Sequence, residues 1–288
     1  MKYKTHIIVL CVIVIVGVVF ALRINGRVPL DTTTESRSLY MIQSDAQGKA
    51  YVIHTPNTYT FSIVDERGSV LKDFSLTHTK LMHVIVARKD LAYFQHVHPE
   101  FDAGAGVFTL KDLVFPADGV YRIFADFVPG DTHKDAQGAS VPVTLSEDVL
   151  VGVGTHYIPQ PIGSEEKTKI FNGYRITLLS DNPIVSGKET MLSFEIQDKG
   201  IPVIDLEPYL GALGHTVVLR ENTLQFIHAH PMEHGEGSRA STVDFMVDFP
   251  ESGTYKVFTQ FQRAGKIITS DFVVSVIKGQ LKEGHSMH

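Results

Sequence analysis

Two stretches of the chain carry the same spacing of histidines, and this repeat sets the strongest limit on the fold. In 81–99, LMHVIVARKDLAYFQHVHP, one histidine is followed thirteen residues later by a second and two residues after that by a third. The stretch 213–231, LGHTVVLRENTLQFIHAHP, repeats this spacing. In both, a β-branched run, a polar break and an aromatic-containing run predict a β-hairpin. The histidines are His83, His96, His98, His215, His228 and His230.

Hairpin geometry predicts that each trio of histidines shares one face of its hairpin. A turn at the polar break places His83 directly opposite His96, and in the second stretch His215 directly opposite His228. Directly opposed residues have Cβ atoms about 4.5–5.5 Å apart, and a residue two positions further along returns to the same face. A slip of one residue would scatter the rings over both faces, so the convergence depends on the register.

The rest of the chain predicts an all-β protein built from an internal repeat. Short apolar segments recur about every 8–12 residues between turn residues, and none shows a helical period. The pattern F-x-I-x-D at 61–65 recurs at 194–198, and F-P-x-x-G-x-Y at 115–121 recurs at 249–255. We therefore expect two tandem Ig-like antiparallel β-sandwiches, preceded by one N-terminal transmembrane helix.

The G-x-Y pattern also predicts a tyrosine corner in each sandwich. Tyr121 and Tyr255 would each enter a late strand and bond back to the main chain. Two residues further on, where antibody domains place a cysteine, stand Ile123 and Val257. Apolar side chains would thus replace the disulfide between the sheets.

The composition of successive segments predicts the domain organisation. The segment 154–169 concentrates proline, glycine and charge, which is typical of a linker, and the last residues are polar. The expected organisation is 1–22 signal anchor or transmembrane helix, 23–45 linker, 46–153 first Ig-like domain, 154–169 linker, 170–278 second Ig-like domain and 279–288 tail.

The amino terminus predicts insertion into a membrane. An unbroken apolar run at 7–22 follows Lys2 and Lys4. Sixteen helical residues reach about 24 Å, close enough to a hydrocarbon core of about 30 Å for a signal anchor. The alternative is a signal peptide cleaved after Ala21. Both place the bulk of the chain outside the cytoplasm, in the periplasm or at the cell surface.

Composition and motifs exclude several classes of function. The formal net charge is −6, without a basic patch, which argues against a nucleic-acid partner. The single cysteine, Cys11, lies in the apolar run, so no disulfide framework or thiolate zinc site is available downstream. No nucleophile elbow, phosphate loop or HExxH helix occurs. We therefore expect a protein that is not an enzyme.

Three imidazoles gathered on one face are a ligand set for a late transition metal. Neutral imidazole binds copper and zinc without help from thiolates. Met232 and His234 follow the second trio, and the tail adds further histidine and methionine, a soft set that favours copper over zinc. Glu100 follows the first trio as an oxygen ligand, and Asp73 and Asp205 would orient imidazoles from outside the coordination sphere.

A structural role for the same histidines is the alternative. His-x-His-Pro could close a strand, with the ring nitrogens bonded to loop carbonyls and the proline ending the ladder. Four further histidines have no counterpart in the repeat, and we expect surface positions for them. They are His54, His78, His133 and His156.

These motifs resemble those of a bacterial family of envelope proteins. The runs DFSLTHTKLMHVIVARKDLAYFQHVHPEF and DLEPYLGALGHTVVLRENTLQFIHAHP, each followed by F-P-x-x-G-x-Y, are similar to that family over roughly residues 50–278. The resemblance implies tandem Ig-like or cupredoxin-like domains outside the cytoplasm, and an association with heavy metals, particularly copper. The ligand positions it implies are His83, His96, His98, His215, His228 and His230.

Together the sequence predicts a membrane-anchored extracytoplasmic protein that binds a transition metal as a chaperone, buffer or sensor. Copper is the expected ion and zinc the second choice. The partners expected are the membrane, through the amino-terminal helix, and an envelope protein. The alternative functions are a non-catalytic structural or partner-binding module with architectural histidines, and an auxiliary subunit of an envelope complex.

Overall fold

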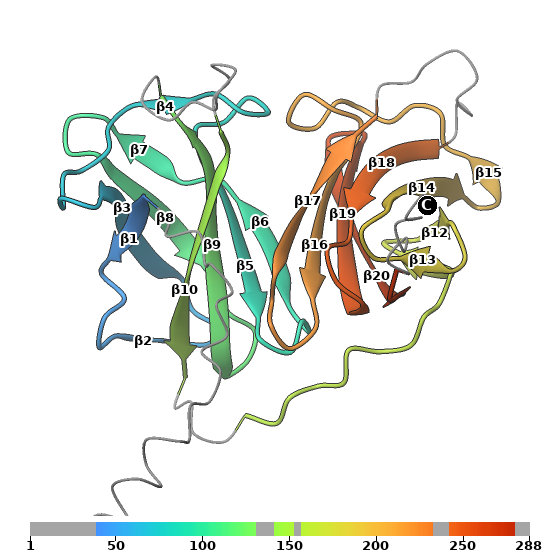
Figure 1. Cartoon of the computed structure of the whole chain (residues 1–288), viewed down its shortest axis with the longest axis horizontal. Coiled ribbons are helices and arrows are strands. Elements are labelled where there is room, and N and C mark those ends of the chain that lie inside the picture. The colour runs from blue at the N-terminus through green and yellow to red at the C-terminus, as the bar shows by residue number, and fades with distance from the viewer. Residues whose placement is uncertain (1–38, 131–140, 153–156, 233–241, 280–288) are drawn as a thin grey trace, which may run out of the picture. The chain divides into compact units, whose positions relative to one another are not determined.

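The computed structural model describes residues 39–130, 141–152, 157–232 and 242–279, apart from the side chains of His228 and His230. Throughout these residues the chain is all-β, in two repeated domains of sandwich-like sheets, as Figure 1 shows. The strands of the first domain are β1 (Tyr40–Ser44), β2 (Ala50–Tyr51), β3 (Asn57–Asp65), β4 (Phe74–Ser75), β5 (His83–Arg88), β6 (Phe94–Val97), β7 (Glu100–Asp102), β8 (Val107–Leu113), β9 (Gly119–Pro129) and β10 (Val143–Val151). Those of the second are β11 (Thr168–Phe171), β12 (Tyr174–Ser180), β13 (Ile184–Val185), β14 (Glu189–Asp198), β15 (Ile201–Pro202), β16 (His215–Arg220), β17 (Phe226–Pro231), β18 (Thr242–Asp248), β19 (Gly253–Arg263) and β20 (Lys266–Ile277).

The first domain pairs two sheets around one core. One sheet has the strand order β1-β3-β8-β7, and the other has the order β2-β10-β9-β5-β6, with β4 on the edge of β9. The alternation of strand residues sends every second side chain into the core. Phe61 and Phe108 come from the first sheet, and Val84 and Ile123 from the second. The predicted apolar replacement for a disulfide at Ile123 is therefore confirmed.

The second domain repeats this arrangement with one difference. Strand β17 pairs with β16 at its beginning and with β18 at its end, so both sheets join into one path, β11-β12-β14-β18-β17-β16-β19-β20-β13. In the first domain the corresponding chain is divided at His98-Pro99 into β6 and β7. Val257 lies fully buried in the core of the second domain, as predicted.

A third apolar cluster joins the two domains. The face of β5 opposite the first core carries Ile85 and Ala87, and the equivalent face of β16 carries Val217 and Leu219. The rings of Phe94 and Phe258 stack across the boundary, with centroids 4.3 Å apart and planes at 7°. Because β5 is buried on both faces, it is apolar from Val84 to Ala87 rather than alternating.

The two domains contact each other in a reciprocal way. Lys256, which follows Tyr255, donates to the carbonyl of Leu91 in the hairpin turn of the first domain at 3.0 Å. Arg122, which follows Tyr121, donates to the carbonyl of Thr223 in the hairpin turn of the second domain at 3.0 Å. Equivalent residues therefore make equivalent contacts in both directions, as in an isologous dimer interface.

Both predicted tyrosine corners are present. The hydroxyl of Tyr121 donates to the carbonyl of Ala117 at 2.8 Å, and that of Tyr255 to the carbonyl of Glu251 at 2.7 Å. Both side chains are fully buried. Burial raises the pKa of the Tyr121 hydroxyl to about 12, so it remains a donor at neutral pH.

We expect Tyr121→Phe and Tyr255→Phe each to lower the free energy of unfolding by about 1 kcal/mol, because the hydrogen bond donated by a buried tyrosine side chain is lost. Urea unfolding followed by circular dichroism measures the loss. Tyr157→Phe is the control. An unchanged midpoint in both corner variants would show that these hydrogen bonds contribute nothing net.

The beginning of the folded region differs from the prediction. Strand β1 lies inside the segment 23–45, which we expected to be linker, and it pairs with β3 from Tyr40↔Asp65 to Ser44↔Phe61. The short alternation of buried and exposed residues in YMIQS was hidden by the polar residues around it. The predicted membrane helix at 7–22 lies outside the described residues. No helix long and apolar enough to cross a bilayer occurs in the described part of the chain.

Candidate metal centre

The histidine hairpins form, but their register is displaced from the predicted one. In the first, Ile85 rather than His83 lies opposite His96. In the second, Val217 rather than His215 lies opposite His228. Each register has moved by two residues because the turn lies one residue later along the chain than predicted, and Leu91 adopts a positive φ of 59° within it. A shift of two residues preserves the face, so the side on which the histidines lie is unchanged.

The first trio converges on one point. Nδ1 of His83 lies 3.0 Å from Nε2 of His96 and 3.2 Å from Nε2 of His98. One nitrogen from each ring falls within 4.8 Å of the others. Three imidazole nitrogens held about 2.0–2.1 Å from one ion in tetrahedral geometry lie about 3.3 Å apart. The two distances from His83 are therefore close to those expected around a bound ion.

Hydrogen bonds on the outer nitrogens of His83 and His96 fix which nitrogen of each of these two rings faces inward. Nε2 of His83 lies 2.9 Å from the carbonyl oxygen of Thr77, which can only accept, so this nitrogen carries the proton. Nδ1 of His96 lies 3.0 Å from Oε1 of Gln260 and donates to it. In their neutral forms the two rings would point unprotonated nitrogens at each other across 3.0 Å. Outer acceptors of this kind are what orient histidines at metal sites.

Electrostatics favours the uncharged forms of His96, His98 and His215. Burial, reinforced by the neighbouring histidines, lowers the pKa of His96 well below its usual value. Burial also lowers the pKa of His98 to about 3 and that of His215 to about 4. These three histidines thus offer neutral imidazole, the form that binds a metal, at physiological pH.

These pKa shifts predict that acid destabilises the metal-free protein. An unfolded histidine titrates near 6.5, so below that pH the unfolded chain binds protons that the folded chain does not. The stability contributed by His98 and His215 is present above about pH 6.5 and is lost as the pH falls toward 4 and then 3. The loss is at most about 1.4 kcal/mol per pH unit for each histidine. Thermal unfolding of chelator-treated protein between pH 7.5 and 5 measures it, and a melting temperature independent of pH would contradict it.

The second trio is not placed as a unit. His215 begins β16, and its Nε2 lies 3.3 Å from the carbonyl oxygen of Leu210, the position equivalent to His78. Its ring lies 6.4 Å from that of His83 and 6.3 Å from that of His96. His228 and His230 lie on β17, and their side chains are outside the described residues. The structure therefore places His215 beside the first trio.

His78, expected at the surface without a role, belongs to the same cluster. Its ring is exposed and lies 4.8 Å from that of His215 and 6.1 Å from that of His83. A tight turn, with backbone hydrogen bonds between Thr77 and Lys80 in both directions, holds it there at a positive φ of 49°. His54 is exposed, as expected, and His133 and His156 lie outside the described residues.

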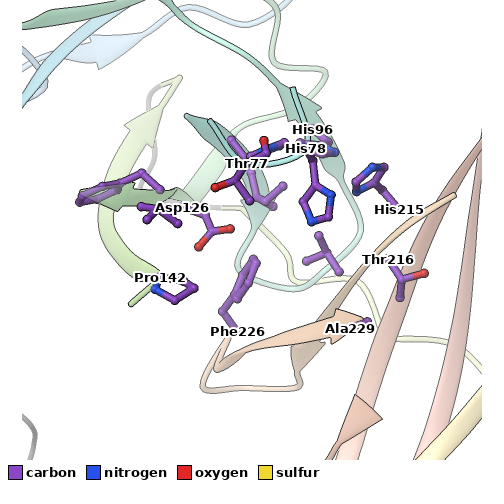
Figure 2. Close-up of a pocket in the computed structure, with 14 residues that line it drawn as sticks. Thr77, His78, His96, Asp126, Pro142, His215, Thr216, Phe226 and Ala229 are labelled. Atoms are coloured by element: carbon purple, nitrogen blue, oxygen red, sulfur yellow. Dashed lines mark hydrogen bonds between the residues drawn. The ribbon is translucent and has the colours of Figure 1, made fainter. Parts of the chain in front are cut away.

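A cavity of about 270 Å³ adjoins the cluster. Figure 2 shows His78, His96 and His215 grouped together, across the cavity from Pro142 and Phe226. Both domains line it, because Ile85 and Asp126 come from the first and Val217 from the second. The histidines therefore stand at the boundary between the domains rather than inside one of them.

Other predicted contributors lie elsewhere. Glu100 forms an exposed ion pair with Lys111 at 2.5 Å. Asp205 accepts a hydrogen bond from Arg263 at 2.9 Å, so it orients no histidine there. Gly130 packs against the carboxylate of Asp73, and the backbone N–H of Gly130 donates to the carbonyl of Asp73. The orienting role expected of the two aspartates falls instead to Thr77 and Gln260.

Sequence reasoning missed Gln260, although a signal for it existed. In the repeat, FTQF at 258–261 corresponds to FADF at 124–127, so a polar residue interrupts the same apolar strand in both copies. In the sheets Asp126 pairs with His83, and Gln260 pairs with His215. A polar residue directly opposite the first histidine of each hairpin was therefore a sign of a polar site.

Comparisons with known proteins give a family and little else. A sequence model described as a domain of unknown function (DUF8832) matches residues 38–143 and 168–278. Curated proteins gave no match. Similar solved structures include domains 4–9 of the surface layer protein SbsC, with 16% identity, 85% of this chain and 32% of that chain covered, and a TM-score of 0.25.

Two further structures are similar to the same degree. Yersinia pseudotuberculosis InvD matches with 12% identity, 86% of this chain and 60% of that chain covered, and a TM-score of 0.27. A Salmonella alpha-2-macroglobulin mutant matches with 12% identity, 83% of this chain and 15% of that chain covered, and a TM-score of 0.26. The chain thus spans about a third of the length of the SbsC fragment. None of these likenesses carries an argument about function.

Proposed function

Because the chain belongs to the DUF8832 family, whose description assigns no activity, we propose its function from the site itself: the protein binds a late transition metal ion through His83, His96 and His98. The observation that carries the proposal is the pair of inward nitrogens 3.0 Å apart on His83 and His96, whose outer nitrogens are already bonded to acceptors. When both rings are neutral, two lone pairs face each other at that distance and repel. A cation between them removes the repulsion.

Copper is the first ion proposed and zinc the second. A set made only of imidazoles suits both ions, and at a given nitrogen site Cu(II) binds more tightly than Zn(II). Three protein ligands leave a fourth position on the ion. No paired carboxylates or nucleophile accompany the trio among the described residues, so we propose a carrier, buffer or sensor rather than an enzyme. For the second trio the sequence prediction remains a prediction.

We also propose that the two domains are Ig-like sandwiches of the cell envelope. The tyrosine corners and the two-sheet cores support the Ig-like assignment. The apolar run at 7–22 supports membrane anchoring, with the domains in the periplasm or at the cell surface. An envelope protein would be the partner of such a carrier.

One observation favours a second function, in which the histidines are architectural. The bond from His96 to Gln260 crosses the boundary between the domains, so the network could serve only to join them. In that case the protein would be a non-catalytic structural or partner-binding module.

Metal retention distinguishes the two functions. The full chain is stripped with chelator, loaded separately with Cu(II) and Zn(II), dialysed, and assayed by elemental analysis beside a His96→Ala/His98→Ala variant. We expect one ion per chain in the unsubstituted protein and none in the variant, with copper displacing zinc in competition. Retention near zero in both proteins, with the variant merely less stable, would support the architectural role and overturn metal binding.

A further inference from the structure

His215 lies at the edge of the first trio although it belongs to the other domain. Ring centroids within the trio are 4.8–5.3 Å apart. Four imidazoles around one ion, each nitrogen about 2.0–2.1 Å away, would have centroids about 5.2 Å apart. The centroid of the His215 ring lies 6.4 Å from that of His83 and 6.3 Å from that of His96, about 1 Å more than this expected distance. The ring lies beside the trio, outside the group of three nitrogens that already converge.

The local structure around His215 repeats that around His83. Each residue begins the first strand of its hairpin, and each directs Nε2 to a carbonyl of the turn that precedes it, Thr77 for His83 and Leu210 for His215. In His83 this bond turns Nδ1 toward the other rings. The same bond in His215 leaves Nδ1 as the nitrogen with the lone pair.

A second contact from the same domain reaches the trio independently. Gln260 lies opposite His215 on the neighbouring strand β19, accepts from His96 at 3.0 Å, and donates through Nε2 to Thr269 at 3.1 Å. Its amide is therefore held in place by its own domain. It fixes the orientation of a ring that belongs to the other domain.

We propose that the metal centre is shared between the two domains, with His215 as the fourth protein ligand of the ion held by His83, His96 and His98, and with Gln260 positioning His96. The inference rests on the proposed function and deepens it. Four imidazoles close a tetrahedral coordination sphere, as in structural zinc sites, and fill the four equatorial positions of tetragonal Cu(II), so no equatorial water is left to exchange. Such a centre stores or senses the ion and ties its binding to the docking of the two domains.

The experiment measures metal affinity and access to the ion in the full chain. Competition with a chromophoric chelator gives the affinity for Cu(II) in the unsubstituted protein, in His215→Ala and in the control His54→Asn. Asparagine suits the control because it tolerates the positive φ of 56° at that exposed position. Added imidazole, followed by electron paramagnetic resonance of Cu(II), then reports whether the ion has an open position.

We expect His215→Ala to bind Cu(II) at least about tenfold more weakly and to accept one imidazole that restores the unsubstituted spectrum, whereas the unsubstituted protein and His54→Asn accept none. Gln260→Leu should weaken binding by about 10–100-fold, the usual effect of removing a partner of a ligating histidine. His215→Gln, which keeps an amide able to donate to Leu210, repeats the test if the alanine variant unfolds.

The outcomes separate the two proposals. A His215→Ala affinity within threefold of the control, or an unsubstituted protein whose ion takes up imidazole as readily as the variant, overturns the shared centre while leaving metal binding by the trio intact. Failure of the unsubstituted protein to retain any Cu(II) or Zn(II) overturns both.

Discussion

Replacing His83 with alanine is expected to remove stoichiometric metal binding from the protein. Nδ1 of His83 is common to both short distances of the trio, 3.0 Å to His96 and 3.2 Å to His98. Without it, the ring nitrogens of His96 and His98 lose the third ligand that lies close to both of them. Loss of a single outer partner already weakens metal sites about 10–100-fold, so loss of this central ligand should exceed about 100-fold.

The same substitution should abolish the stabilisation that the metal gives. A ligand present at one hundred times its dissociation constant stabilises the folded protein by about 2.7 kcal/mol. For a folded region of this size that corresponds to about 5–10 °C in melting temperature. The unsubstituted protein should show this rise on addition of Cu(II), and His83→Ala should show none.

Two controls keep the result interpretable. His54→Asn should retain the full rise, because His54 is exposed and outside the cavity. His98→Ala removes a half-buried ligand, so it tests the same site if the buried His83 cannot be truncated without unfolding. If His83→Ala and His98→Ala show a metal-dependent rise in melting temperature as large as that of the unsubstituted protein, the trio does not bind the metal.

The convergence of the first trio could be predicted from the sequence because it depends only on which face of its strand each histidine occupies. The histidine spacing and the alternation of side chains determine which face the rings occupy, and an error of two residues in the register left that face unchanged. The repeat of F-P-x-x-G-x-Y likewise located both tyrosine corners. Both features could be predicted because they depend only on residues that lie close together in the sequence.

What could not be predicted depends on packing between the domains. The face of β5 that carries Ile85 is apolar because it meets the second domain, and a single sequence does not tell which surface will cover it. Gln260 and His215 come to the trio only through that docking. His78 was missed for a related reason, since its turn brings it to a neighbour, His215, in the other repeat.

The docking of the two domains also leads to a prediction about a residue outside the histidine cluster. Phe258→Ala is expected to lower the free energy of unfolding by about 3–5 kcal/mol, the usual cost of truncating a buried phenylalanine. Its side chain is 4% exposed and stacks on Phe94, which lies in β6 two residues before His96. Truncation leaves a cavity between the domains and removes the ring against which that strand rests.

Metal affinity separates this interface effect from a general loss of stability. Phe272→Ala is the matched control, because Phe272 is fully buried inside the core of the second domain and should cost a similar free energy. Urea unfolding gives the stability of both variants, and chelator competition at a temperature where both are folded gives their affinity for Cu(II). If the ion is bound across the domain boundary, Phe258→Ala should bind it more weakly than Phe272→Ala, since a looser boundary moves Gln260 and His215 away from the trio. Equal affinity in the two variants would mean that the first domain holds the ion alone, and that the contacts made by Gln260 and His215 stabilise the boundary without serving the site.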